Sequence, residues 1–400
     1  MKKFFVKPLL AALLIAGGLQ NAVAQDYLIN SVKGNQSANS KESFTFKDVI
    51  NIERTPVKNQ GSSGTCWSYS ANSFLESEMI RMGKEPVEIS QIFTARNAYV
   101  EKGINYVRMH GAITLGDGGS LHDVINMYRK YGALPQSVYT GLNYGTSKNK
   151  FAEMAAINEA FLAAVVKNPN GELTPNWVKA YTAVIDSYLG QVPESFEFKG
   201  KKYTPQTFAK EVVGINPDDY VELSSFTNKP YYQKMVLMVP DNWDLDLVYN
   251  VKVDELTDII DNALAKGYSV GWAGDISDKG FSWKNGVAYV PAKPFADMTD
   301  EEKANMFKGP QPEMNITAEI RQKAFDNYDT TDDHGMHIVG LTKDQNGKEY
   351  YIIKNSWGAT NDYKGYIYMT KNFVKLKSTA ILLHKGGLPK ELAKKINVKQ

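Results

Sequence analysis

The chain of 400 residues has a single cysteine, Cys66, and the segment around it constrains the fold more than any other. Cys66 follows a Gly-rich turn, and the apolar residues after it recur at helical spacing until Gly83, a C-terminal stop signal. The pattern predicts that Cys66 lies in the first turn of a buried helix. There the free backbone N–H groups and the helix dipole favour a thiolate, so a lowered thiol pKa is expected. A small buried core residue is the alternative interpretation of a lone cysteine.

Two later segments favour the chemical interpretation. Residues 332–340 read Asp-Asp-His-Gly-Met-His-Ile-Val-Gly, and residues 352–358 read Ile-Ile-Lys-Asn-Ser-Trp-Gly. A cysteine, a histidine and an asparagine can form an activated nucleophile, in which the base lies beside the thiol and a third group orients the base.

On these motifs the chain resembles the papain superfamily of cysteine peptidases and, within it, the bleomycin hydrolase / aminopeptidase C branch. Gln60 lies six residues before Cys66, as the oxyanion-hole glutamine of that family does, and Trp67 follows the nucleophile. Asn355 begins the family's Asn-Ser-Trp-Gly signature, in which Trp357 is expected to cover the histidine–asparagine hydrogen bond and to be a substrate-binding residue. The resemblance implies an α+β, papain-like two-lobe fold, with a helical lobe carrying the cysteine and an antiparallel β-sheet lobe carrying the histidine and asparagine.

Two histidines compete for the role of the base. The family places a glycine six residues after the histidine, and His334 with Gly340 fits this spacing whereas His337 does not. His334 stands at the start of a predicted strand, and His337 lies inside it on the opposite face. We therefore assign His334 as the base and interpret His337 as a structural histidine.

The predicted strands 335–342 and 349–355 form a hairpin whose loop decides the register. A two-residue Asn-Gly turn would place His334 opposite Ala359. A four-residue loop centred between Asp344 and Gln345, with Gly347 left-handed, would place His334 opposite Asn355. The catalytic interpretation predicts the longer loop.

The Gly-rich run 116–120 precedes a predicted helix over 121–131, and no Gly-Lys-Ser/Thr follows it, so a nucleotide site is not indicated. The run is either a simple turn or a substrate contact. The resemblance implies that Gly118 and Gly119 form the pair that lets the substrate backbone approach closely.

Residues 1–24 read as a signal peptide, with a lysine-rich start, a short apolar run and a small-x-small site that predicts cleavage before Gln25. The mature protein is expected to be periplasmic or secreted. This departs from the cytoplasmic location of the bleomycin hydrolase branch.

Residues 25–400 are expected to form one peptidase domain. The spacing from Cys66 to His334 is 268 residues (334 − 66), far more than in minimal papain-like enzymes. Most of the excess is predicted to lie in a largely helical insertion at about 146–250, because Thr174-Pro175 and Thr204-Pro205 are helix-start signals.

Composition excludes several other functions. The net charge is +2 and the basic residues do not cluster, so nucleic acid is not an expected partner. Neither a metal nor a cofactor is expected, because the five histidines lack metal-ligand spacing. Membrane insertion is not expected either, because no segment after residue 24 is long and apolar enough for a membrane helix. A serine hydrolase is not indicated, because the sequence lacks the Gly-x-Ser-x-Gly motif. Four aspartates are candidates for polar groups of the cleft, namely Asp117, Asp275, Asp332 and Asp333. We interpret each as a solvated surface carboxylate or a helix cap and not as a catalytic acid.

The predicted function is thiol-dependent hydrolysis of peptide bonds, with Cys66, His334, Asn355 and Gln60 as catalytic residues. The resemblance implies an aminopeptidase, because in that branch a C-terminal arm blocks the non-primed side of the cleft. It also implies a homo-oligomer, since enzymes of that branch form hexamers. Residues 388–400 read as a basic helix and a short tail that ends before such an arm would enter the cleft, which weakens both inferences. A cysteine endopeptidase with an open cleft and a catalytically silent peptide-binding homologue are the alternatives.

Overall fold

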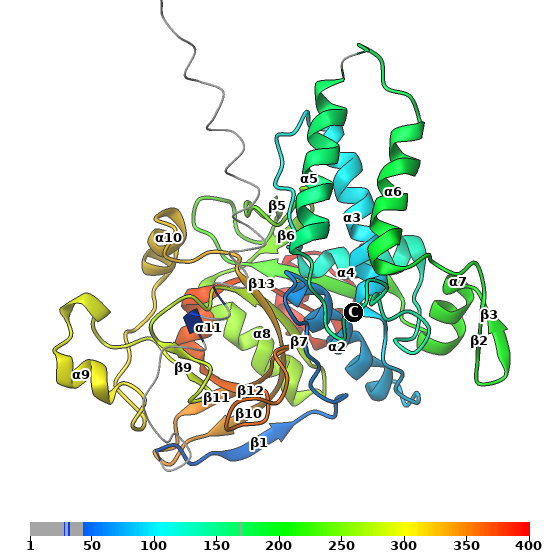
Figure 1. The fold of residues 1–400 in the computed structure, drawn as a ribbon. Helices are drawn as coiled ribbons and strands as arrows, with labels where there is room; N and C mark the ends of the chain where they lie inside the picture. The colour runs from blue at the N-terminus through cyan, green and yellow to red at the C-terminus, as the bar shows by residue number, and fades with distance from the viewer. Residues whose placement is uncertain (1–27, 29–30, 33–42, 169) are drawn as a thin grey trace, which may run out of the picture.

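The computed structural model describes residues 28, 31, 32, 43–168 and 170–400. The predicted signal peptide and the cleavage site before Gln25 lie outside these residues. The described chain forms a helical lobe packed against one large sheet (Figure 1). Within the described ranges, every helix is too short or too polar to span a membrane.

The helical lobe contains α2 (Cys66–Arg81), α3 (Gln91–Arg108), α4 (Leu121–Tyr131), α5 (Ala152–Lys167) and α6 (Asn176–Leu189), and α3, α5 and α6 stand side by side in Figure 1. Cys66 is the first residue of α2, as predicted, and Gly83 follows the helix with a left-handed φ of 71°. Helix α3 continues through Gly103, where the absence of a side chain lets the ring of Tyr181 on α6 approach closely.

Side-chain caps fix where several of these helices begin. The Ser90 hydroxyl accepts a hydrogen bond from Phe93 N (3.0 Å) at α3, and Asp123 Oδ2 accepts one from Ser120 N (2.7 Å) at α4. The Thr317 side chain caps α10 (Ala318–Asp326) by accepting a hydrogen bond from Ile320 N. In α8 (Val253–Ala265) the cap position belongs to Lys252, and Asp254 lies within the first turn.

The large sheet has 11 strands in the order β5-β6-β4-β13-β7-β10-β11-β12-β9-β8, with β1 also paired to β10. Their bounds are β1 (Lys47–Asn51), β4 (Tyr220–Ser224), β5 (Lys234–Val236), β6 (Leu247–Asn250), β7 (Val270–Gly274), β8 (Phe281–Ser282), β9 (Val287–Ala288), β10 (His334–Lys343), β11 (Glu349–Lys354), β12 (Tyr366–Thr370) and β13 (Ser378–His384). The expected antiparallel pairing holds for most neighbours, but β4–β6 and β12–β9 are parallel.

Shorter elements surround these two layers. Helices α8 and α11 pack against each other beside the sheet, and the hairpin of β2 and β3 lies at the far edge of the helical lobe next to α7 (Figure 1). The remaining bounds are β2 (Phe196–Phe198), β3 (Lys201–Tyr203), α7 (Pro205–Phe208), the π-helical turn Ala209–Val213, the 3-10 turns Pro217–Asp219, Phe295–Asp297 and Lys385–Gly387, and helices α9 (Asp300–Asn305), α11 (Lys371–Lys377) and α12 (Lys390–Lys395).

The predicted insertion at about 146–250 contains two kinds of structure. Helices α5, α6 and α7 and the π-helical turn up to Val213 are helical, as expected. Residues 220–250 instead supply β4, β5 and β6 to the large sheet. That 146–250 is an inserted unit stays a prediction.

The lobes meet where α2 packs on β10. A Cβ at Gly335 would lie 2.8 Å from Ser70 Oγ and 3.1 Å from Trp67 Cα, so only glycine permits this approach without a shift. The N-terminal end of α2, with Cys66, therefore lies against the start of β10, with His334.

The hairpin of β10 and β11 differs from both predicted registers. Its last pair is Lys343 with Glu349, so a five-residue loop, 344–348, joins the strands, and Gly347 is left-handed as expected (φ 82°). A bulge between Ile338 and Gly340 shifts the register again. The predicted pairing of His334 opposite Asn355 is therefore wrong. Asn355 lies just beyond β11, where its side chain is free to turn toward the ring of His334.

Candidate active site

Cys66 and His334 line one pocket at the junction of the lobes, and both are almost fully buried. Gly119 also lines it, whereas Gln60, Gly118, Asn355 and Trp357 stand behind or beside its wall. The complete lining is Cys66, Trp67, Gly119, Ser120, Glu222, Leu237, Val239, Asp241, Ala273, Asp332, His334, Gly335 and Thr379.

The thiol of Cys66 lies in a dry setting at the start of α2. Burial raises its pKa to about 12, although the backbone N–H groups of Gly335 and Trp67 hydrogen-bond to the sulfur and act in the opposite direction. The lowered pKa expected from the helix terminus is thus outweighed by desolvation. The sequence pattern gives the helix position but carries no measure of burial.

The ring of His334 is held by Asn355. His334 Nε2 lies 2.8 Å from Asn355 Oδ1, and the same oxygen accepts a hydrogen bond from the backbone N–H of Ser356 (2.7 Å). Because the backbone N–H can only donate, the oxygen is the acceptor and Nε2 carries the hydrogen of the neutral ring. Nδ1 has no hydrogen-bond partner among the described residues. It is therefore the basic nitrogen of this tautomer.

Two tryptophans keep water from this hydrogen bond. The ring centroid of Trp357 lies 4.8 Å from that of His334, and Trp283 packs edge-on against Trp357 at 5.1 Å. Burial lowers the pKa of His334 to about 4, against the opposing effect of Asn355. The resting ring is therefore neutral. Sequence analysis did not single out Trp283, which lies in the long segment after β7.

Gln60 is fully buried beside the Asn355 segment. Its Nε2 donates to Ser63 O (2.6 Å), and its Oε1 accepts from Ser356 Oγ (2.6 Å). One amide hydrogen of Gln60 remains for another acceptor, because the NH₂ group has two. Ser356 thus ties the nucleophile loop to the asparagine loop, a role that the motif alone does not reveal.

The paired glycines lie between α2 and the segment that follows β5. A Cβ at Gly119 would lie 2.8 Å from the Trp67 ring, so packing alone already requires glycine there. A Cβ at Gly118 would collide with the carboxylate of Asp241. The predicted contact of this pair with a substrate backbone stays a prediction.

His337 lies on the opposite face of β10 from His334, as predicted. It is buried against α2, where its Nδ1 lies 3.0 Å from Ser73 Oγ and its ring packs edge-on against Phe74. It does not line the pocket that holds Cys66. The structure therefore brings His334, and not His337, to the thiol.

The four aspartates interpreted as solvated or capping groups instead brace loops around the pocket. Asp275 is buried and accepts hydrogen bonds from the backbone N–H groups of Ser277 and Thr331, at 2.8 and 2.9 Å. Asp333 accepts one from Ile276 N at 2.9 Å. Asp117 accepts one from Gly64 N at 3.2 Å, and Asp332 accepts one from Asp241 N at 2.8 Å.

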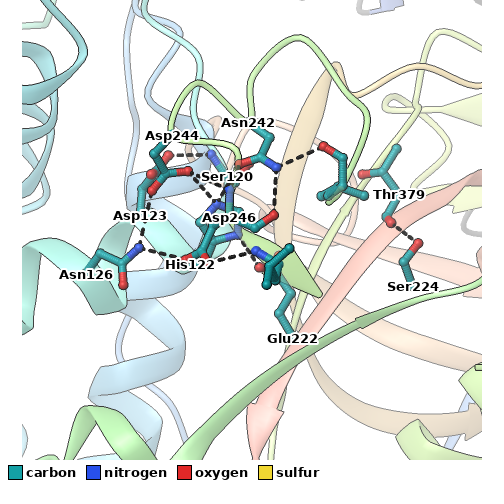
Figure 2. A network of polar contacts seen from close by, with 12 residues as sticks. Ser120, His122, Asp123, Asn126, Glu222, Ser224, Asn242, Asp244, Asp246 and Thr379 are labelled. Atoms are coloured by element: carbon teal, nitrogen blue, oxygen red, sulfur yellow. Dashed lines mark hydrogen bonds and ion pairs between the residues drawn. The ribbon is translucent and has the colours of Figure 1, made fainter. Parts of the chain in front are cut away.

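A polar network around His122 lies behind the pocket wall (Figure 2). His122 Nδ1 contacts Glu222 Oε2, and Nε2 lies 3.1 Å from Asn242 Oδ1 and 3.3 Å from Asp244 Oδ1. Burial acts to lower the pKa of His122, but Glu222 and Asp244 raise it well above its usual value. The ring is therefore a buried cation.

The same network contains a group with metal-ligand geometry. His122, Asp123 and Asp244 each offer one atom, and these atoms lie within 4.8 Å of one another. Sequence spacing gave no sign of it, because Asp244 comes from a distant segment. Both ring nitrogens of His122 already contact oxygen atoms of neighbouring side chains, so the imidazolium occupies the place of a cation.

The fold and the pocket define a papain-like α+β protein. PepW from Lactobacillus rhamnosis HN001 has a similar structure, with a TM-score of 0.67 and 22% identity over 95% of this chain and 92% of that one. The chain belongs to the Peptidase C1-like family, whose model matches residues 14–400. It is thus a cysteine-type peptidase, as the sequence motifs predicted.

Curated relatives match most of the chain. Aminopeptidase C of Lactococcus lactis subsp. cremoris is 23% identical over 93% of this chain and 90% of its own length. Cysteine proteinase 1, mitochondrial, of Saccharomyces cerevisiae is 24% identical over 94% of this chain and 83% of its own length. These similarities confirm the predicted resemblance to the bleomycin hydrolase / aminopeptidase C branch.

Replacing the structural histidine should make the fold less sensitive to acid. Burial lowers the pKa of His337 well below its usual value, so the unfolded chain binds a proton below about pH 6.5 that the folded chain does not. The stability from neutral His337 is present above that pH and is lost as the pH falls toward the folded-state pKa. In urea denaturation between about pH 7 and 5, His337→Asn should flatten the decline of the unfolding free energy by up to about 1.4 kcal/mol per pH unit.

The matched control is His110→Asn. His110 is exposed and has a φ of 54°, which asparagine tolerates. This variant should keep the wild-type slope. Equal slopes for the wild type and both variants would contradict the assignment of His337 as a buried neutral group.

Proposed function

We propose that this chain is an aminopeptidase that hydrolyses peptide bonds outside the cytoplasm, with Cys66 as nucleophile and His334 as base. One observation carries the proposal. The hydrogen bond from His334 Nε2 to Asn355 leaves Nδ1 as an unpaired base in the pocket that also holds the only thiol. Family membership supports the peptidase reaction.

The first half of the reaction forms a thioester. The thiol proton of Cys66 passes to Nδ1 of His334, and the sulfur attacks the carbonyl carbon of the peptide bond. The resulting thiolate and imidazolium attract each other strongly in a dry pocket, which offsets the desolvation that opposes each charge alone. The spare amide hydrogen of Gln60 and the Cys66 backbone N–H stabilise the oxyanion.

The second half releases both products. The imidazolium of His334 gives its proton to the leaving amine, and the C–N bond breaks. The neutral ring then takes a proton from water, whose oxygen attacks the thioester and frees the acid. Asn355 keeps the ring oriented throughout, and the cover of Trp357 keeps that hydrogen bond dry.

The aminopeptidase mode is supported by the similarity to aminopeptidase C of Lactococcus lactis, which matches nearly the whole chain. An endopeptidase with an open cleft is the second candidate, because residues 397–399 line a cavity other than the one that holds Cys66. A silent peptide-binding homologue is the third. The complete set of Gln60, Cys66, His334 and Asn355 argues against it.

Substitution of the nucleophile and of each histidine tests the catalytic roles. Cys66→Ala and His334→Ala should each lower peptide hydrolysis at least about 1,000-fold, because each removes a group that forms or carries a bond in the reaction. His337→Ala should keep most of the activity. The measurement is kcat/KM with a fluorogenic peptide amide under reducing conditions. Full activity of Cys66→Ala would overturn the proposal. Loss of activity in His337→Ala, with activity retained in His334→Ala, would overturn the choice of His334 as the base.

Matched peptide amides with free and acetylated N-termini test the mode of cleavage. We expect kcat/KM for the free-amine peptide to exceed that for the acetylated peptide by at least about 10-fold, because an aminopeptidase must recognise the ammonium group. Product analysis by mass spectrometry should show release of one residue at a time. Equal cleavage of both peptides, or cuts within the chain, would establish the endopeptidase instead.

We propose export on the basis of the leader-like pattern in residues 1–24. The family match begins at residue 14, inside that pattern, so the processing site needs a direct measurement. N-terminal sequencing of the protein from its native host should give a first residue of Gln25. An unprocessed chain in the cytosolic fraction would refute the proposed location.

A further inference from the structure

The catalytic pocket contains acidic groups that the proposed chemistry does not use. Asp241, Asp332 and Glu222 line it together with Cys66 and His334. They come from three separate segments, namely the loop between β5 and β6, the segment before β10, and strand β4. Cysteine peptidase chemistry at the thiol needs no carboxylate among the reacting groups, so these acids require another explanation.

Asp241 and Asp332 form a half-buried pair beside Gly118. Asp241 N donates to Asp332 Oδ2 at 2.8 Å, and the carboxylate of Asp241 packs directly on the Cα of Gly118. No hydrogen bond or ion pair engages the Asp241 carboxylate within residues 43–168 and 170–400. The oxygens of Asp241 thus face the pocket without a partner in the described chain.

Lys102 lies near the pair but hydrogen-bonds to neither carboxylate. It is fully buried, its ammonium group donates to the backbone carbonyls of Gly116 (2.9 Å) and Gly118 (2.5 Å), and its charge acts to lower the pKa of both Asp241 and Asp332. Burial and the neighbouring Asp241 raise the pKa of Asp332 to about 8. Two acids held together in this way repel each other, and a cation placed between them would relieve both the repulsion and the desolvation.

Glu222 gives an independent sign that a hydrogen-bond donor is missing from the same pocket. Glu222 is 6% exposed, and its Oε1 has no hydrogen-bond partner among the described residues. Only its Oε2 is engaged, by His122. An unpaired buried carboxylate oxygen costs free energy, so it is expected where a ligand supplies the donor.

The free space fits a small cation. The cavity volume is about 20 Å³, which is room for roughly one water-sized group. An ammonium group has that size. Leu237 and Val239 also line the pocket.

The wall that carries Asp241 is fixed in place. Asn242 donates to Leu237 O (2.8 Å) and Asp246 O (3.0 Å), and Trp243 Nε1 donates to Asp123 Oδ2 (2.9 Å). Figure 2 shows Asn242, Asp244 and Asp246 gathered over His122 on α4. His122 Nε2 lies 3.1 Å from Asn242 Oδ1 and 3.3 Å from Asp244 Oδ1, so α4 also helps to hold this loop in place.

We propose that Asp241 and Asp332 bind the α-ammonium group of the substrate's first residue, and that the loop 237–246 closes the cleft beyond it. The unpaired Glu222 oxygen adds negative charge to the same pocket. This inference rests on the proposed function, since it requires Cys66 and His334 to act on the next peptide bond. Such a loop would restrict cleavage to the first peptide bond of the substrate.

The test compares Asp241→Asn and Asp332→Asn with the wild type on the free-amine and acetylated peptides. Each variant keeps the shape of the side chain and removes a charge. The ratio of kcat/KM values, free over acetylated, should fall about 10- to 100-fold in each variant, because a charge-assisted hydrogen bond to the ammonium group is lost. Cys66 alkylation by iodoacetamide should be no slower than in the wild type, because the Asp241 carboxylate raises the pKa of the thiol and its neutralisation favours the thiolate; this shows that the nucleophile is intact.

Asp329→Asn is the matched control, because Asp329 is exposed and lies three residues before Asp332 outside the pocket. It should keep the wild-type ratio. A wild type that does not prefer the free amine would refute the aminopeptidase proposal itself. If the wild type prefers the free-amine peptide and both pocket variants keep this preference, only the assignment of Asp241 and Asp332 would be overturned. A peptide whose N-terminal amine is replaced by a hydroxyl should behave like the acetylated peptide in the wild type.

Discussion

The close approach of α2 to β10 is the contact on which the rest of the structure depends. Gly335 allows the backbone of Trp67 to touch the strand, and this sets the start of the helix against the start of β10. A side chain at this position would force Ser70 Oγ and the Trp67 backbone to shift, and the thiol and the imidazole come from opposite sides of that contact. The core of each lobe gives stability, but this one junction decides whether a nucleophile and a base meet.

A second constraint operates through Ser356. Its backbone N–H holds Asn355 Oδ1, and its hydroxyl holds Gln60 Oε1. The asparagine that orients the base and the glutamine assigned to the oxyanion are therefore positioned by one residue. A small shift of this turn would change the ring orientation and the oxyanion donor together, so the two parts of the site cannot vary independently.

Local patterns predicted much of this architecture. The start of α2 at Cys66, helix α4 and the cap at Thr317 follow from spacing and capping residues, and the motifs identified the family. The predicted register of the β10–β11 hairpin was wrong, because the turn residues alone indicate neither the bulge near Val339 nor the five-residue loop. The pocket acid Asp241 was missed, since its contacts with Gly118 and Asp332 join segments that share no pattern in sequence. The predicted lowering of the Cys66 pKa was also wrong. Burial raises this pKa, and the burial of the thiol depends on how the two lobes pack together.

The solitary cysteine has a consequence for oxidative damage. When a thiol is oxidised to a sulfenic acid, a neighbouring cysteine can normally capture it as a disulfide and prevent further oxidation. Cys66 is the only cysteine of the 400 residues, so no such partner exists within the chain. Recovery then depends on small thiols that can reach a side chain only 7% exposed. The burial that shields the nucleophile from oxidants therefore also slows its repair, and a loss of activity by over-oxidation would be permanent.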